Sequence, residues 1–145
     1  MFTKYSKCID FNEQREWNVN GGKCGICGDA WDVHPRPNEV GGLYATGIIV
    51  RRYPSGGATI NVSAELTAPH KGWFEFRICS VDPSPGVEAT QACLDENLLN
   101  LADGSGSRYQ LPPNAAAGFY GVNLTLPSGL ICRHCVVQWK YHCGK

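Results

Sequence analysis

Short stretches in which apolar and polar residues alternate recur along this chain, and this period-two pattern is typical of half-buried β-strands. The clearest example is residues 73–79, which follow a turn marked by Pro69 and Gly72. One face of this stretch holds Phe74, Phe76 and Ile78, and the other holds Glu75 and Arg77. On the same grounds we predict strands over residues 44–53, 58–66, 73–79, 120–126 and 135–141.

One stretch, residues 90–102, has the spacing of a helix. Its leucines recur at i, i+4 and i+7, Thr90 is suited to cap the N-terminus, and Asp103 and Gly104 follow as a stop. Residues 1–23 read as irregular with at most one helical turn, and residues 103–118 as a long loop. Short strands, regular turns and one short helix favour an all-β fold, an antiparallel β-sandwich with long loops, formed as a single domain over residues 1–145.

The composition excludes several classes of partner. The 145 residues include 13 basic and 13 acidic side chains, so the chain has no net charge and no electrostatic footprint for nucleic acid. No apolar run approaches the roughly 18 residues of a membrane span. We therefore expect a monomer that binds neither nucleic acid nor membranes.

Eight cysteines and two N-glycosylation sequons, Asn61-Val62-Ser63 and Asn123-Leu124-Thr125, favour an oxidising, secreted setting. Cys79 and Cys93 flank one loop and are expected to form a disulfide; the other pairings stay open. A zinc site built from the CxxC pairs at 24–27 and 132–135 is the alternative, although disulfides account for all eight cysteines at once. The N-terminus lacks the apolar segment of a secretion leader, so we expect a processed or shortened sequence.

A histidine at the start of a strand, His70, is the best candidate metal ligand. If residues 135–141 pair beside residues 73–79, the phenol of Tyr141 and the imidazole of His70 meet at one end of the sandwich. Such a pair suits copper, which prefers imidazole nitrogen and accepts a weak axial group. The alternatives are a surface-turn histidine and a core tyrosine with a satisfied hydroxyl. Familiar hydrolase, zinc-protease and nucleotide-binding motifs are absent from the sequence.

Several stretches together resemble one family, the lytic polysaccharide monooxygenases of auxiliary-activity family fifteen from insects and other invertebrates. The motifs that carry the resemblance cover nearly the whole chain from about residue 8 and occur in the family's order: GGKCGICGD at 21–29, GGLYATGII at 41–49, WFEFR at 73–77, QACLD at 91–95, and LPSGL at 126–130 leading to VQWKY at 137–141.

The resemblance implies a secreted, copper-dependent enzyme with an immunoglobulin-like β-sandwich that cleaves chitin or cellulose oxidatively. In the family, copper is held by an N-terminal histidine, through its amino group and side chain, and by a second histidine, with a tyrosine lying axially. His70 is similar to the second histidine and Tyr141 to the axial tyrosine. This chain begins Met1-Phe2 and has no histidine before His34. We therefore expect a form that is shortened at the N-terminus, and shortening at the C-terminus stays open.

Two functions remain open at this stage, copper-dependent oxidation of chitin or cellulose and non-catalytic binding of the polysaccharide on the same scaffold. Trp31, Tyr44 and Trp73 are candidate contacts to a flat glycan surface, the alternative being ordinary packing in the core or in loops. A cysteine-rich structural or zinc domain is a third hypothesis. The sequence does not separate chitin from cellulose.

Overall fold

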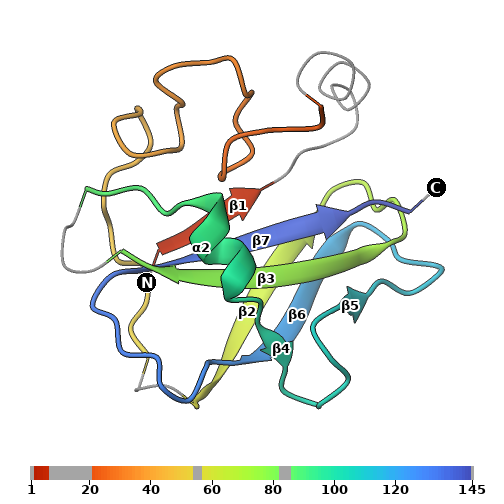
Figure 1. Cartoon of the computed structure of the whole chain (residues 1–145). Helices are drawn as coiled ribbons and strands as arrows, with labels where there is room; N and C mark the ends of the chain where they lie inside the picture. Colours follow the sequence, from red (N-terminus) through yellow and green to blue (C-terminus); the bar gives the residue numbers. More distant parts are fainter. Residues whose placement is uncertain (1, 7–20, 54–56, 82–85, 145) are drawn as a thin grey trace.

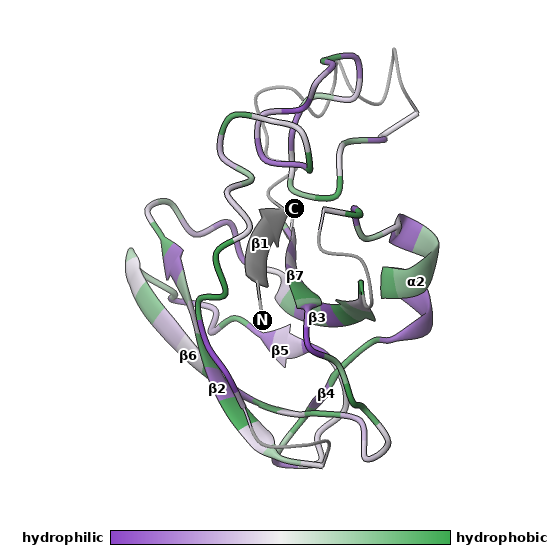
Figure 2. Ribbon diagram, turned by 90° about the vertical axis from the view of Figure 1, so that its left-hand side faces the viewer, coloured by the Kyte–Doolittle hydropathy of each residue, from purple (hydrophilic) through white to green (hydrophobic). Residues whose placement is uncertain are grey.

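Two β-sheets packed face to face make up the computed structural model of this chain. The structure describes residues 21–53, 57–81 and 86–144 in full, and the backbone of residues 2–6. One sheet has the strand order β1-β7-β3-β5, and the other has the order β2-β6-β4 (Figure 1). The two layers are also seen from the side in Figure 2. The prediction of an all-β sandwich is confirmed.

The first sheet is centred on two long strands. β3 (Trp73–Ser80) and β7 (Cys135–His142) pair antiparallel over eight residues each, with Phe74 opposite Tyr141 and Ile78 opposite Val137. β5 (Tyr109–Gln110) pairs with the start of β3. β1 (Phe2–Ser6) lies parallel to β7, in a region that the sequence predicted to be irregular. The pairing of residues 135–141 beside residues 73–79, on which the meeting of Tyr141 and His70 depends, is therefore present.

The second sheet follows the predicted alternation closely. β2 (Thr59–Leu66) pairs with β6 (Gly118–Thr125) over eight residues, and β4 (Asn100–Leu101) adds a short third strand. The inward-facing residues are buried or half-buried, and they are Ile60, Val62, Ala64 and Leu66 on β2 and Tyr120, Val122 and Leu124 on β6. The residues between them are mostly exposed, so one face of this sheet is core and the other is surface.

An aromatic cluster fills the space between the sheets. Phe74 is fully buried and its ring lies 5.1 Å from that of Tyr141, 5.2 Å from Trp139, 5.7 Å from Tyr109 and 6.2 Å from Tyr120. Three of these contacts are edge-to-face, the geometry that aromatic quadrupoles favour. Full burial of one such side chain stabilises the fold by about 1.5–3 kcal/mol.

The prediction of a strand over residues 44–53 is wrong. These residues form no ladder with any described strand, and the N–H of Tyr44 instead bonds the carbonyl of Pro37 at 2.8 Å. Several of their apolar side chains are exposed, namely Tyr44, Ile48 and Val50. β-branched and aromatic residues favour a strand only when a neighbouring strand supplies a pleated surface to pack against. The composition of residues 44–53 alone therefore wrongly predicted a strand.

The predicted helix is shorter than expected. α2 (Gln91–Glu96) is capped by Thr90, whose Oγ1 accepts from the N–H of Cys93 at 3.2 Å, as predicted. The prediction of a helix to residue 102 is wrong, because the backbone of 97–99 pairs with β3 instead: Ile78 N–H donates to Asn97 O at 3.0 Å, and Leu99 N–H donates to Phe76 O at 2.8 Å. Within the described residues, no helix is long and apolar enough to span a membrane.

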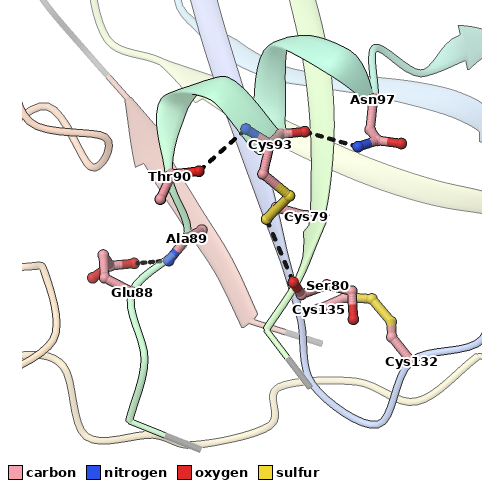
Figure 3. The surroundings of a disulfide bond; sticks show 9 residues. All are labelled: Cys79, Ser80, Glu88, Ala89, Thr90, Cys93, Asn97, Cys132 and Cys135. Carbon is pink, nitrogen blue, oxygen red and sulfur yellow. Dashed lines mark hydrogen bonds between the residues drawn. A yellow bond between two sulfur atoms is a disulfide. The ribbon is translucent and has the colours of Figure 1, made fainter. Parts of the chain in front are cut away.

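The disulfides attach peripheral segments to the sheets. Cys79–Cys93 joins β3 to α2, which confirms the predicted pair, and Cys132–Cys135 lies beside it (Figure 3). Cys24 is also disulfide-bonded. Since Cys24, Cys132 and Cys135 are all in disulfides, the zinc site proposed for the two CxxC pairs is wrong.

Phe74→Ala should lower the free energy of unfolding by about 3–5 kcal/mol, because it leaves a cavity at the centre of the aromatic cluster. Phe119→Ala is the matched control: Phe119 is 74 % exposed on β6, and its loss should change stability by less than about 0.5 kcal/mol. Urea unfolding of both variants measures the difference. Equal effects would show that the core is not organised around Phe74.

Candidate functional site

The turn that carries His70 joins β2 to β3 and is held against the end of β7. The N–H of Gly144 donates to the carbonyl of His70 at 2.8 Å, and the N–H of Leu111 donates to that of Gly72 at 2.9 Å. Lys71 and Gly72 both have positive φ, 52° and 80°. A Cβ at Gly72 would collide with the backbone of His142, so only glycine fits this close approach. The backbone at His70 is therefore fixed from several sides.

Tyr141 binds the same turn from within the core. Its hydroxyl accepts from the N–H of His70 at 2.6 Å and donates to the carbonyl of Lys71 at 2.7 Å. The predicted meeting of residues 141 and 70 at one end of the sandwich thus occurs, but the contact described is between the phenol and the backbone. The Tyr141 hydroxyl therefore positions the backbone of the turn at His70 and Lys71. Its role as an axial ligand stays a prediction.

The other histidines are placed differently. His142 follows Tyr141 and lies on the opposite face, where its Nε2 is 3.0 Å from a carboxylate oxygen of Glu75. The carbonyl of His134 bonds the N–H of Val81, at the far end of β3 from His70. His34 is exposed in a loop. In the described part of the chain, no three His, Cys, Asp or Glu side chains form a group that could hold a metal ion. Of the four histidines, His70 is the one that lies in the 67–72 turn.

Beside the turn lies a charged cluster that the sequence reasoning missed. Glu75 was assigned to the polar face of its strand, yet its side chain is only 7 % exposed. Its carboxylate contacts Arg77 Nη2 at 3.0 Å, Arg108 Nε at 3.2 Å and His142 Nε2 at 3.0 Å. Arg77 also pairs with Asp95 of α2 at 3.1 Å. The outer face of β3 is thus covered by other segments of the chain.

The electrostatics of this cluster favour the ionised carboxylate. Burial by itself raises the pKa of Glu75, but hydrogen bonds from Arg77 and His142, the charge of His142 and a hydrogen bond from Arg108 outweigh burial and lower the pKa from 4.5 to about 2. Glu75 therefore stays charged across the whole physiological range.

Trp73 is the one predicted glycan contact that lies next to His70. It is half-buried at the start of β3, and its ring stacks on His142, with centroids 4.9 Å apart, and under the guanidinium of Arg108, also 4.9 Å away. Trp73, His142 and Arg108 form a stack, which we call the Trp73 stack, at the same end of the sheet as the 67–72 turn. This stack combines aromatic and cationic surfaces.

Trp31 and Tyr44 lie elsewhere. Trp31 is 40 % exposed in the loop that covers the outer face of β7, with the guanidinium of Arg36 4.8 Å from its ring. Tyr44 is 65 % exposed, and its N–H donates to the carbonyl of Pro37 within the loop that follows Trp31. The described ring contacts of Trp31 are thus within its own loop, whereas those of Trp73 are to His142 and Arg108.

Comparison with known proteins identifies the scaffold. The family model described as "Lytic polysaccharide mono-oxygenase, cellulose-degrading" matches residues 3–145. Among solved structures, the AA15 lytic polysaccharide monooxygenase from Thermobia domestica, in the Cu(I) state, is similar with a TM-score of 0.84 and 48% sequence identity, over 91% of this chain and 67% of that chain. Among curated proteins, none matches this chain.

Glu75→Gln should flatten the dependence of stability on pH. Because the folded pKa lies below the ordinary value of 4.5, the contribution of Glu75 is fully present above that pH and is lost as the pH falls toward 2. Urea unfolding between about pH 7 and pH 2.5 measures this slope. Glu65→Gln, which alters an exposed carboxylate on β2, should retain the wild-type slope. If stability depends on pH in Glu75→Gln as steeply as in the wild type, the lowered pKa assigned to Glu75 would be wrong.

Proposed function

Because the chain belongs to the lytic polysaccharide monooxygenase family, we propose that its partner is an extracellular polysaccharide, chitin or cellulose, and that His70 is its imidazole donor toward copper. The observation that carries the proposal is the match over residues 3–145, which spans both sheets and the His70 turn. Disulfides at Cys79–Cys93 and Cys132–Cys135 support a secreted setting. We also propose that the protein acts as a monomer.

The described residues meet part of the requirement for copper. An imidazole on a rigid turn is a good ligand, and the fixed backbone at His70 limits the positions that its ring can take. Copper affinity also depends on the number and geometry of ligands, and the described residues supply no group of three donor side chains. Copper, when bound, supplies the oxidative chemistry of the family. His70 is the donor that we propose from the described residues.

A second candidate function is binding of polysaccharide without oxidation, and the surface beside the His70 turn favours it. The Trp73 stack offers an aromatic edge and two cationic or polar groups beside the His70 turn. Flat glycan surfaces are bound by such mixtures of aromatic faces and hydrogen-bonding groups. Trp31 and Tyr44 are proposed as separate contacts at a distance from this point, since they lie on other segments.

Copper(II) titration by calorimetry, with an EPR spectrum of the bound form, tests the copper proposal. Tight one-to-one binding with a nitrogen-rich axial spectrum would show that the chain completes a copper site around His70, and His70→Ala should then abolish binding. His34→Ala, which alters an exposed loop histidine, should leave the affinity unchanged. Weak binding in the wild type would favour the second candidate function, and an unaltered affinity in His70→Ala would place the copper site elsewhere.

Sedimentation with chitin and with cellulose particles, without added copper, tests the polysaccharide proposal. Trp73→Ala should weaken binding by about two- to tenfold, the value of one aromatic stacking contact. Phe119→Ala removes an exposed aromatic ring from the opposite sheet and should have no effect. If the wild-type chain sediments with neither chitin nor cellulose, the proposal of a polysaccharide partner is wrong. Preference for one of the two identifies the substrate.

A further inference from the structure

The two N-glycosylation sequons, far apart in sequence, lie side by side in the structure. Asn61 on β2 is directly opposite Asn123 on β6, and Nδ2 of Asn61 donates to Oδ1 of Asn123 at 2.9 Å. Both side chains are exposed on the outer face of the sheet. Ser63 and Thr125 complete the two sequons on the same face.

The surface around this pair has room for a carbohydrate. Gly121, one position along the outer face from Asn123, has no side chain, and a Cβ built there would have only Nδ2 of Asn61 within 4 Å, at 3.9 Å. The flanking residues Thr59, Ser63 and Glu65 are exposed. Figure 2 shows β2 and β6 at the edge of the described part of the molecule, with no helix over their outer face.

We infer that the two sequons form one modification site, which carries a single N-linked oligosaccharide per folded molecule, on Asn61 or on Asn123 but not on both. The donor is an oligosaccharide linked to a lipid pyrophosphate. A bond forms between Nδ2 of the asparagine and C1 of the first sugar while the bond from C1 to the pyrophosphate oxygen breaks. The lipid pyrophosphate leaves with the electron pair, and the amide proton passes to a base.

The exclusion of a second oligosaccharide follows from the register. Side chains directly opposite each other in an antiparallel pair have Cβ atoms about 4.5–5.5 Å apart, which is narrower than a substituted sugar ring. The strands cannot slip to relieve the crowding, because a shift of one residue would turn Ile60, Ala64 and Leu66 out of the core. A chain with both asparagines modified therefore cannot pair β2 with β6.

One oligosaccharide is compatible with the native contact. A glycosylated asparagine keeps its carbonyl oxygen and one N–H, so the hydrogen bond between Asn61 and Asn123 can form whichever residue is modified. Modification takes place on the unfolded chain, and folding then selects the singly modified form. The inference rests on a secreted setting but not on copper or polysaccharide binding.

The test is secretion from a eukaryotic host behind a cleavable leader, followed by intact mass measurement before and after treatment with peptide N-glycosidase. The secreted wild type should carry one oligosaccharide. Ser63→Ala and Thr125→Ala, which each remove one sequon, should still carry one, at the remaining asparagine, and the double variant should carry none. Full use of either sequon alone distinguishes exclusion from a sequon that is merely poorly modified.

Two oligosaccharides on the folded secreted wild type, or none, would overturn the inference. So would a sequon that stays unmodified after the other is removed. Ser63→Thr and Thr125→Ser preserve both sequons and control for the substitutions themselves, and Asn123→Gln replaces Thr125→Ala if that variant is not secreted. Copper titration and particle sedimentation of the enzymatically deglycosylated protein report on the proposed function independently.

Discussion

The antiparallel pairing of β3 with β7 is the constraint on which the rest of the structure depends. It places Phe74 opposite Tyr141 and so builds the aromatic cluster on the inner face of the sheet. It brings the hydroxyl of Tyr141 to the His70 turn. On the outer face, it sets His142 beside Trp73 and Glu75, which assembles the charged cluster and the Trp73 stack.

Because strand residues alternate between faces, one pair of strands serves two purposes. Tyr141 contributes to the core and to the backbone of the turn, whereas its neighbour His142 contributes to the surface cluster. The candidate copper ligand and the candidate glycan contact are thus supported by adjacent residues of β7. A disturbance of the register would affect both features together.

Strand periodicity predicted β2, β3, β6 and β7 because each has a clear inner face, and the loop between Cys79 and Cys93 indicated their disulfide. The same reasoning failed where tertiary partners decide the structure. Residues 44–53 have strand-forming side chains but pair with no strand among the described residues. Residues 97–99 do not continue the helix, because their backbone forms hydrogen bonds with β3. For the site, alternation indicated that residue 141 would reach residue 70 if the two strands paired, and the structure supplies that pairing. They did not reveal the cluster around Glu75, since Arg108 comes from a distant loop that carries no regular pattern.

The parallel pairing of β1 with β7 joins the first described residues of this chain to the last strand. Contacts between residues so far apart in sequence require the closure of a loop of almost the whole chain, and domains rich in such contacts fold slowly. During synthesis, β1 and β3 both emerge before β7 and must wait for it, with the apolar face of β3 uncovered in the meantime. The sheet that holds the candidate site is therefore completed only after β7 has been synthesised, and until then the apolar face of β3 makes the nascent chain prone to aggregate.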